Sequence, residues 1–410
     1  MNNLAVNAAE RVSYPLISPD PQSFYDYFAG NTFAKANTWT NGVCFVSQND
    51  ELQKPYRIFN RSLEANPQYP SFRITDHSNS LLTAWHSQTD KEPVEFELLD
   101  FNDMSHEKIM WLRASGEVNS LVVNKTEKLL AMVYHDENWR VDIRRSNNFQ
   151  LREVAQHTSP IIGVFFHEDI LFSLSNKLIV SYPEDRRESS LVSSSKKILG
   201  WAQHPTDPYI ILIEPESYSI VDLSTLRIVK RAEWTKQIKW FNFLQKYSSH
   251  SFEHPVDNIA AVFSTDGNHL FLGGYGKLAV FDWHDVLRPR CVQPEPSAMI
   301  DIHANNYSIA KRGKYLTAHI INIVPVNRDR LLCATADGYL SMLNIRTGVV
   351  NLLLTPGSGG VRMNSLQLCA NSKYLAMTGY YYGFDNNHYN VESALLIWKL
   401  SRLLNKGSVV

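Results

Sequence analysis

Residues 258–283 read NIAAVFSTDGNHLFLGGYGKLAVFDW, and the fold prediction starts from this stretch. Short apolar runs alternate here with clusters of Asp, Asn, Gly and Ser, which is typical of strands joined by tight turns. The pair Asp266-Gly267 supplies residues that tolerate positive φ where a hairpin requires it. The runs expected as strands are Ile259–Phe263, His269–Leu272 and Lys277–Asp282.

The same pattern recurs along the chain. It is clear again at Ile320–Arg346, where Ala336-Asp337-Gly338 forms the second turn, and at Met363–Leu400. Fainter copies precede these, and the seven expected units begin near residues 72, 118, 161, 198, 258, 320 and 363. Most spacings are about 40 residues, the length of one four-stranded propeller blade. Two longer spacings indicate insertions, at Thr235–Pro255 and Asp285–Leu316.

These units predict an all-β fold, a single β-propeller with four antiparallel strands per blade. The last unit runs out after its third strand, near Leu400, and an unpaired blade edge would be exposed to aggregation. We therefore expect an N-terminal strand, Val43–Ser47 or Tyr56–Asn60, to complete that blade. Seven blades are favoured, and eight are the alternative because residues 1–70 could hold further strands. Residues 71–400 then form the repeats of one domain, and residues 401–410 form a tail.

Several of these units resemble the WD-repeat family. Residues 336–348 match the Asp turn, the third strand and the following Thr-Gly turn of that family, with Leu343-Asn344 in the place of its Trp-Asp pair. Phe281-Asp282 and Trp398-Lys399 occupy the same place in their units, and Gln156–Ile161 resembles the His-containing loop before a first strand. The resemblance implies a rigid platform that binds proteins or peptides, usually without chemistry.

Composition is that of an ordinary folded protein. Hydrophobic residues make up 44% of the chain and charged residues 20%, and the formal net charge is −1. A chain this neutral has no overall field to hold a polyanion, so direct nucleic-acid binding is not favoured. We expect neither a secretory signal nor a membrane span. The four cysteines lack metal-site spacing and are expected as reduced thiols, which favours an intracellular, cytoplasmic protein.

Candidate sites for chemistry are weak in this sequence. His250 and His254 flank Glu253, but their order differs from the His-Glu-x-x-His arrangement of zinc enzymes. The glycine-rich run Pro356–Gly360 lacks the Gly-Lys-Ser/Thr ending of a phosphate-binding loop. We therefore expect no cofactor, no metal and no enzymatic activity. The alternative is an enzyme, or a propeller that binds a small molecule or a metal at its central channel.

Two segments are better candidates for binding other proteins. The first, 234–247, carries Ile238, Phe241 and Leu244 at three-residue steps, and we expect a short helix with an apolar face. That face either binds a partner or packs on the propeller rim. The second, 380–389, is a tyrosine-rich stretch expected as a long loop, and tyrosine suits binding surfaces. The predicted partner-binding residues are Trp234, Trp240, Phe241, Leu244, Tyr380, Tyr381, Tyr382, Phe384 and Tyr389.

The sequence thus predicts a protein-interaction scaffold, a subunit of a complex with other proteins. Its binding surfaces would be loops and insertions held by a rigid propeller.

Overall fold

A computed structural model describes residues 57–401 of the 410-residue chain, with gaps. The gaps are 64–71, 78–79, 86–93, 103–105, 113–116, 136–137, 147–149, 168, 176, 183–186, 194–197, 236–237, 239–258, 275–276, 290–292, 303–319, 336–339, 355–359, 370–371 and 386–387. The expected strand Val43–Ser47 lies outside the described residues.

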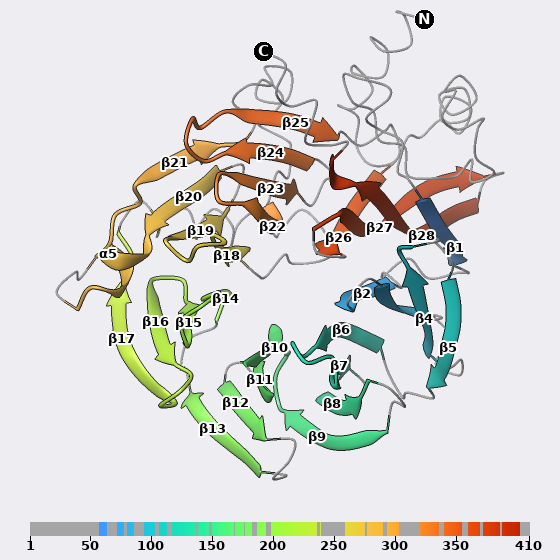
Figure 1. Cartoon of the computed structure of the whole chain (residues 1–410), viewed down its shortest axis with the longest axis horizontal. Coiled ribbons are helices and arrows are strands. Elements are labelled where there is room, and N and C mark those ends of the chain that lie inside the picture. The colour runs from blue at the N-terminus through green and yellow to red at the C-terminus, as the bar shows by residue number, and fades with distance from the viewer. Residues whose placement is uncertain are drawn as a thin grey trace, which may run out of the picture.

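The described strands form seven four-stranded antiparallel sheets. In Figure 1 these sheets stand around a common centre in a propeller-like ring, each running from an inner strand to an outer one. The innermost strands are β2 (Phe72–His77), β6 (Glu117–Val123), β10 (Gly163–His167), β14 (Gly200–Gln203), β18 (Ala261–Phe263), β22 (Ile320–Asn327) and β26 (Gly360–Cys369). All seven begin within a few residues of the unit starts that the sequence predicts.

The remaining strands follow outward from the centre, in chain order except in the last sheet, whose outermost strand is β1. The second strands are β3 (Ser80–Trp85), β7 (Leu129–His135), β11 (Ile170–Leu174), β15 (Tyr209–Ile213), β19 (His269–Gly273), β23 (Arg330–Thr335) and β27 (Tyr374–Asp385). The third strands are β4 (Val94–Asp100), β8 (Trp139–Arg145), β12 (Lys177–Tyr182), β16 (Ser217–Asp222), β20 (Lys277–Asp282), β24 (Leu340–Asn344) and β28 (His388–Lys399). The outermost are β5 (His106–Leu112), β9 (Leu151–His157), β13 (Arg187–Ser193), β17 (Arg227–Glu233), β21 (Ala298–Asp301), β25 (Val350–Leu354) and β1 (Arg57–Leu63).

The last sheet takes its outer strand from the beginning of the described chain. β1 pairs antiparallel with β28, from Arg57 opposite Ile397 to Leu63 opposite Val391. Of the two N-terminal segments considered as the closing strand, the one at Tyr56–Asn60 overlaps β1. The inner strands β2 and β26 are in contact, and Phe101 stacks on Tyr374 with ring centroids 4.6 Å apart. The first and last sheets are therefore neighbours.

The core consists of apolar layers between successive sheets. β7 shows how one strand serves two layers: Leu130, Met132 and Tyr134 pack toward the first sheet, while Ala131 and Val133 pack toward the third. β15, β19 and β23 divide their residues in the same way. Successive side chains of a strand point to opposite faces, so a continuous apolar run serves a sheet that is buried on both sides. This explains why the second strand of each unit is so apolar.

Two cysteines lie within these layers. Cys333 and Cys369 are buried and form no disulfide, and burial raises the pKa of the Cys333 thiol to about 12. A thiol with that pKa stays protonated at neutral pH and is a poor nucleophile.

A one-residue bulge recurs in the outer strands. β5, β9, β13, β17 and β25 each carry one extra residue against the third strand, whereas β21 and β1 pair without a shift. Bulges bend and twist a strand, which makes an exposed edge a poorer template for another chain.

Glycines allow neighbouring sheets to approach at the inner strands and turns. Gly267, in the β18–β19 turn, has φ +75°, and a Cβ there would lie 2.4 Å from the imidazole of His204 in the preceding sheet. Gly348, before β25, also has positive φ (+69°), but nothing lies within 4 Å of its Cβ position. Both glycines therefore have a left-handed backbone conformation, but only Gly267 is in close contact with another side chain.

We expect Gly267→Ala to destabilise the protein more than Gly348→Ala. Both variants pay for a left-handed backbone, about 1 kcal/mol, and only Gly267→Ala also displaces a packed ring, at a further cost of roughly 1–3 kcal/mol. Chemical denaturation of the two variants and the parent chain measures the difference. Equal losses in the two variants would show that the His204 contact contributes nothing.

Candidate functional site

The strand order assigns every connection to one of two faces of the ring. Because the strands of a sheet are antiparallel, the first-to-second and third-to-fourth turns lie on one face, here named the turn face. The second-to-third turns and the connections from one sheet to the next lie on the opposite face, here named the loop face. The Asp266-Gly267 turn belongs to the turn face, and the end of β17 belongs to the loop face.

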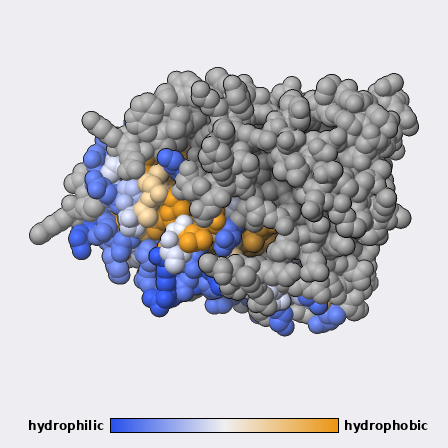
Figure 2. Space-filling model, turned by 90° about the horizontal axis from the view of Figure 1, so that it is seen from above, coloured by the Kyte–Doolittle hydropathy of each residue, from blue (hydrophilic) through white to orange (hydrophobic). Residues whose placement is uncertain are grey.

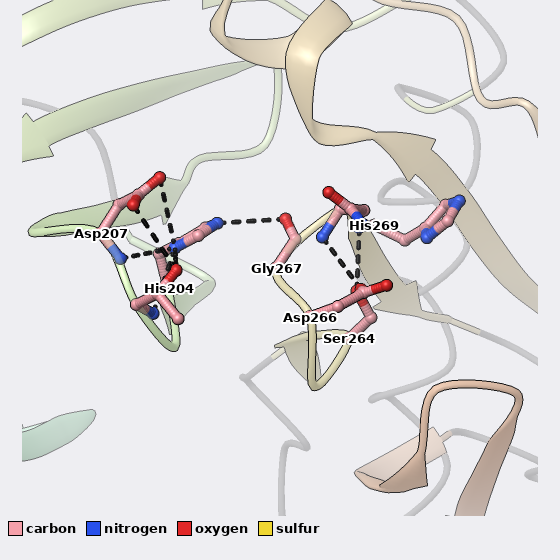
Figure 3. A network of polar contacts seen from close by, with 8 residues as sticks. His204, Asp207, Ser264, Asp266, Gly267 and His269 are labelled. Carbon is pink, nitrogen blue, oxygen red and sulfur yellow. Dashed lines mark hydrogen bonds and ion pairs between the residues drawn. The ribbon is translucent and has the colours of Figure 1, made fainter.

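On the turn face, a buried histidine joins two sheets (Figure 3). His204 lies at the β14–β15 turn, where its Nδ1 accepts a hydrogen bond from the backbone N–H of Asp207 at 2.9 Å. Its Nε2 lies 3.1 Å from the backbone oxygen of Gly267, in the next sheet. A carbonyl can only accept, so this geometry assigns the neutral ring with its proton on Nε2. His204 therefore acts as a bridge between turns.

The neighbouring turn is closed by Ser264 and Asp266 (Figure 3). The Ser264 hydroxyl donates to Asp266 Oδ1 at 2.6 Å, and the same hydroxyl oxygen accepts from the His269 N–H at 3.0 Å. The Asp266 carboxylate also meets Arg328 of the following sheet at 3.2 Å. The Ser264 hydrogen bond is the main cause that lowers the pKa of Asp266, and partial burial opposes it. A serine bonded in this way stabilises a turn and is not held by an imidazole as a nucleophile would be.

Further turn-face contacts join other neighbouring sheets. The Asn124 amide donates to Asp169 at 2.6 Å, and Gln203 Nε2 lies 3.4 Å from His167 Nδ1. Tyr374 donates to the Phe101 carbonyl at 3.4 Å, between the last and first sheets. Together with the His204 and Asp266 contacts, they join five neighbouring pairs of sheets among the described residues of the turn face.

A second serine–histidine arrangement is buried inside the structure. His157 at the end of β9 lies between two hydroxyls of β11 and its turn, with Nε2 2.7 Å from Ser173 and Nδ1 2.9 Å from Ser175. All three side chains are buried, so a substrate has no access to them. The group joins the second sheet to the third.

β8, the third strand of the second sheet, carries a buried charged group. Asp142 lies between Arg144, at 2.9 Å, and Arg140, at 3.7 Å, on one face of the strand. The Arg140 guanidinium stands 5.0 Å from the centroid of the Tyr134 ring. Burial, followed by the Asp142 charge, raises the pKa of Tyr134. A buried acid between two arginines is compensated electrostatically.

The first predicted partner-binding segment is described only at its beginning. Trp234 is fully buried, with ring centroids 4.5 Å from Tyr218 and 5.5 Å from Phe281, and Ile238 is buried in the same apolar layer. These two residues pack against the sheets, as the alternative interpretation of the segment held. Trp240, Phe241 and Leu244 lie outside the described residues, as do His250 and His254.

The second segment is not the long loop that the sequence predicted. Tyr380, Tyr381, Tyr382 and Phe384 belong to β27, and Tyr389 belongs to β28. The two strands pair as far as Asp385 opposite His388. Tyrosine and phenylalanine favour strands, and an Asn-Asn pair suits a tight turn, so the hairpin simply continues past its usual length. The extended hairpin lies on the loop face.

The sequence predicted a turn at Asp266-Gly267, but it did not identify the polar side chains of the turn face that bond between sheets. Of the glycine-rich run, Gly360 begins β26, and residues 356–359 lie outside the described ranges. Within those ranges, no group of three or more His, Cys, Asp and Glu side chains is placed to hold a metal ion. No helix in the described part of the chain is long and apolar enough to cross a membrane.

Comparison with protein-family models finds no match to this chain, and comparison with curated proteins finds none either.

The Asp266 turn predicts a specific dependence of stability on pH. The pKa of Asp266 is lower in the folded chain than the ordinary 3.8, so the folded state favours the ionised form. Its contribution is present above the unfolded-state pKa and is lost as the pH falls through the folded-state pKa. We expect Asp266→Asn to lower the free energy of unfolding near neutral pH and to lose less of it on acidification below about pH 4.

Denaturant titrations at several pH values measure this dependence. The control is Asp285→Asn, which removes a surface ion pair with Arg288 and should change stability little. The prediction is contradicted if the free energy of unfolding of Asp266→Asn falls on acidification as much as that of the wild-type chain.

Proposed function

We propose that the chain is a WD-repeat-like β-propeller whose seven sheets are its blades, and that it acts as a non-catalytic interaction scaffold within a complex of proteins. The resemblance has one structural support. His157 precedes a first strand and meets Ser173 of the second strand at 2.7 Å, which is the His–Ser part of the buried hydrogen-bond set found in that family. An intracellular, cytoplasmic setting belongs to the same proposal.

The observation that carries the proposal is the different use of the two faces. Several described side chains on the turn face form bonds between neighbouring sheets, among them His204 and Asp266. The loop face carries the extended β27–β28 hairpin, and the connection of residues 234–260 begins there, after β17. By strand order, both segments predicted to bind partners therefore begin on the same face. They belong to different sheets of the ring (Figure 1).

This arrangement suits a partner that spans the loop face. A rigid frame loses little conformational entropy on binding, and the paired strands β27 and β28 are part of such a frame. Two contacts on one rigid frame also reinforce each other, because the second is made at high effective concentration.

We expect the triple variant Tyr381→Ser, Tyr382→Ser and Phe384→Ser to lose proteins that the parent chain captures from its native lysate, with its thermal midpoint nearly unchanged. A second variant, Trp240→Ser, Phe241→Ser and Leu244→Ser, should lose the same proteins. Quantitative mass spectrometry of affinity eluates measures the capture. A control with Thr225→Ala and Arg346→Ala, two exposed positions on the turn face, should retain them.

Either loss of the same proteins by the turn-face control or equal capture by all variants would contradict the loop-face proposal. A large fall in the thermal midpoint of the first variant would show instead that the hairpin side chains belong to the core.

A further inference from the structure

The surface of the described chain exposes a few large apolar side chains. Figure 2 shows one side of the molecule, where apolar residues lie among hydrophilic ones. The large apolar residues exposed in the described ranges are Leu151, Ile228, Val229 and Val349, in or next to the outer strands of three different sheets. Exposed apolar residues dispersed in this way are normal on a protein surface and indicate no binding site.

The turn between β18 and β19 contains a chemically labile pair, Asp266-Gly267. In a flexible chain the Gly267 nitrogen can attack the side-chain carboxyl carbon of Asp266. A C–N bond forms while the carboxyl group loses a hydroxyl and the nitrogen loses its proton, so one water leaves and a five-membered imide remains. Water then adds to either imide carbonyl and opens the ring, to aspartate again or to isoaspartate. Glycine favours the ring closure because it has no side chain to hinder it.

The backbone of the folded turn opposes this ring closure (Figure 3). The Gly267 N–H donates to the Ser264 carbonyl at 2.9 Å and Gly267 has φ +75°, the arrangement of a type I turn followed by a left-handed residue. In such a turn the ψ of Asp266 is about 0°. The Gly267 nitrogen then lies on the side of the Asp266 nitrogen, whereas the imide ring needs it beside the Asp266 Cβ.

The side chain of Asp266 is also held in place. Its Oδ1 accepts from the Ser264 hydroxyl at 2.6 Å and from the Asn268 N–H at 3.2 Å, and its Oδ2 lies 3.2 Å from the Arg328 Nε. The Ser264 hydrogen bond is the main cause that keeps the pKa of Asp266 below its ordinary value. The ionised carboxylate is the less reactive form, because its oxygen carries no proton with which to leave. Turning the carboxyl carbon toward the Gly267 nitrogen would break these contacts.

Opening of this turn also disturbs its contacts with the fourth sheet and with α5 (Trp283–Leu287). The Gly267 carbonyl lies 3.1 Å from His204 Nε2, and the Asn268 carbonyl accepts from the Trp283 N–H at 2.8 Å. Isoaspartate carries the main chain through the Cβ and Cγ of residue 266, which lengthens the turn by one atom. The Gly267 carbonyl is then displaced from His204, so the modification would prevent this turn from re-forming.

We propose that Asp266 is a modification site: it isomerises to isoaspartate when this turn opens, and Ser264 protects it in the folded chain. Local opening has a lower free energy than global unfolding, so the turn can open while the rest of the ring stays folded. This site does not depend on the loop-face proposal, because it lies on the turn face and uses other residues.

The test incubates the intact chain near neutral pH, both folded and in guanidinium chloride. Peptide mapping with electron-transfer fragmentation measures isoaspartate at position 266. Asp337-Gly338, the other Asp-Gly pair of the sequence, lies outside the described residues and is the reference in the denatured sample. Both pairs should isomerise at similar rates in guanidinium chloride. Asp266 should react about tenfold or more slowly in the folded chain, because only the open fraction reacts.

Variants of the turn separate protection by Ser264 from general stability. Ser264→Ala should raise the isomerisation rate of Asp266 in the folded chain about fivefold or more, since it removes a hydrogen bond to a charged group. The control Ser297→Ala removes another hydroxyl bond of the same sheet, to the Val280 carbonyl at 3.0 Å, and should leave the rate unchanged.

A second pair of variants changes exposed arginines and leaves the buried serine intact. Arg328→Ala removes the ion pair with Asp266 and should raise the rate about twofold. Arg346→Ala removes a similar ion pair with Asp329 on the same face and should not change it.

The proposal is overturned if Asp266 does not isomerise in the denatured chain, or if it isomerises equally fast in the folded one. Equal rates in Ser264→Ala and Ser297→Ala also overturn it. The thermal midpoint of each variant shows whether it is folded. If Ser264→Ala is unfolded, the arginine variants decide, and equal rates in Arg328→Ala and Arg346→Ala then overturn the proposal.

Discussion

Every sheet of this chain has two apolar faces, and the rest of the structure depends on covering both. A sheet with one apolar face needs a single partner, as in a sandwich, whereas a sheet with two needs a neighbour on each side. Leu331 and Cys333 of β23 face the fifth sheet while Leu332 and Ala334 face the seventh. A row of such sheets leaves two apolar faces uncovered at its ends unless it curves into a ring. The contact of β2 with β26 is what that requirement predicts.

Turn contacts add direction to packing that is otherwise non-directional. Apolar layers let neighbouring sheets slide, because their stabilisation depends mainly on buried area. The bond from His204 to Gly267 and the ion pair of Asp266 with Arg328 join particular turns, so they set the register between sheets. Glycine at position 267 follows from this, since any Cβ there would occupy the space of the His204 ring. The same bonds leave these polar groups little freedom for other chemistry.

The sequence predicted the strands and their grouping well because both rest on local patterns. The hydrophobic runs and turn residues of 258–283 correspond to β18, β19 and β20 within a few residues. The closing strand was also predictable in outline, since a blade lacking one strand needs one from elsewhere in the chain. The features that could not be predicted depend on contacts between residues distant in sequence. His204 and Gly267 are 63 residues apart, and the local sequence around each one gives no sign of its contact with the other. The bulges of the outer strands are likewise set by twist within the assembled sheet, because residues such as Val229 look like ordinary strand residues.

The tyrosine-rich stretch shows how a local pattern can support two structures. Three tyrosines followed by Gly383 resemble a flexible binding loop, yet tyrosine is also a strong strand former, and pairing continued to Asp385. The stretch forms strands because β27 and β28 have the same length, 12 residues each, and can pair throughout. In addition, β1 pairs with seven residues of β28 from the other side. A hairpin paired with β26 along one edge and with β1 along the other is a stiffer platform than a loop of the same composition. A partner that meets this part of the loop face therefore meets a surface held by main-chain hydrogen bonds, where affinity depends less on ordering the site and more on what the partner itself presents.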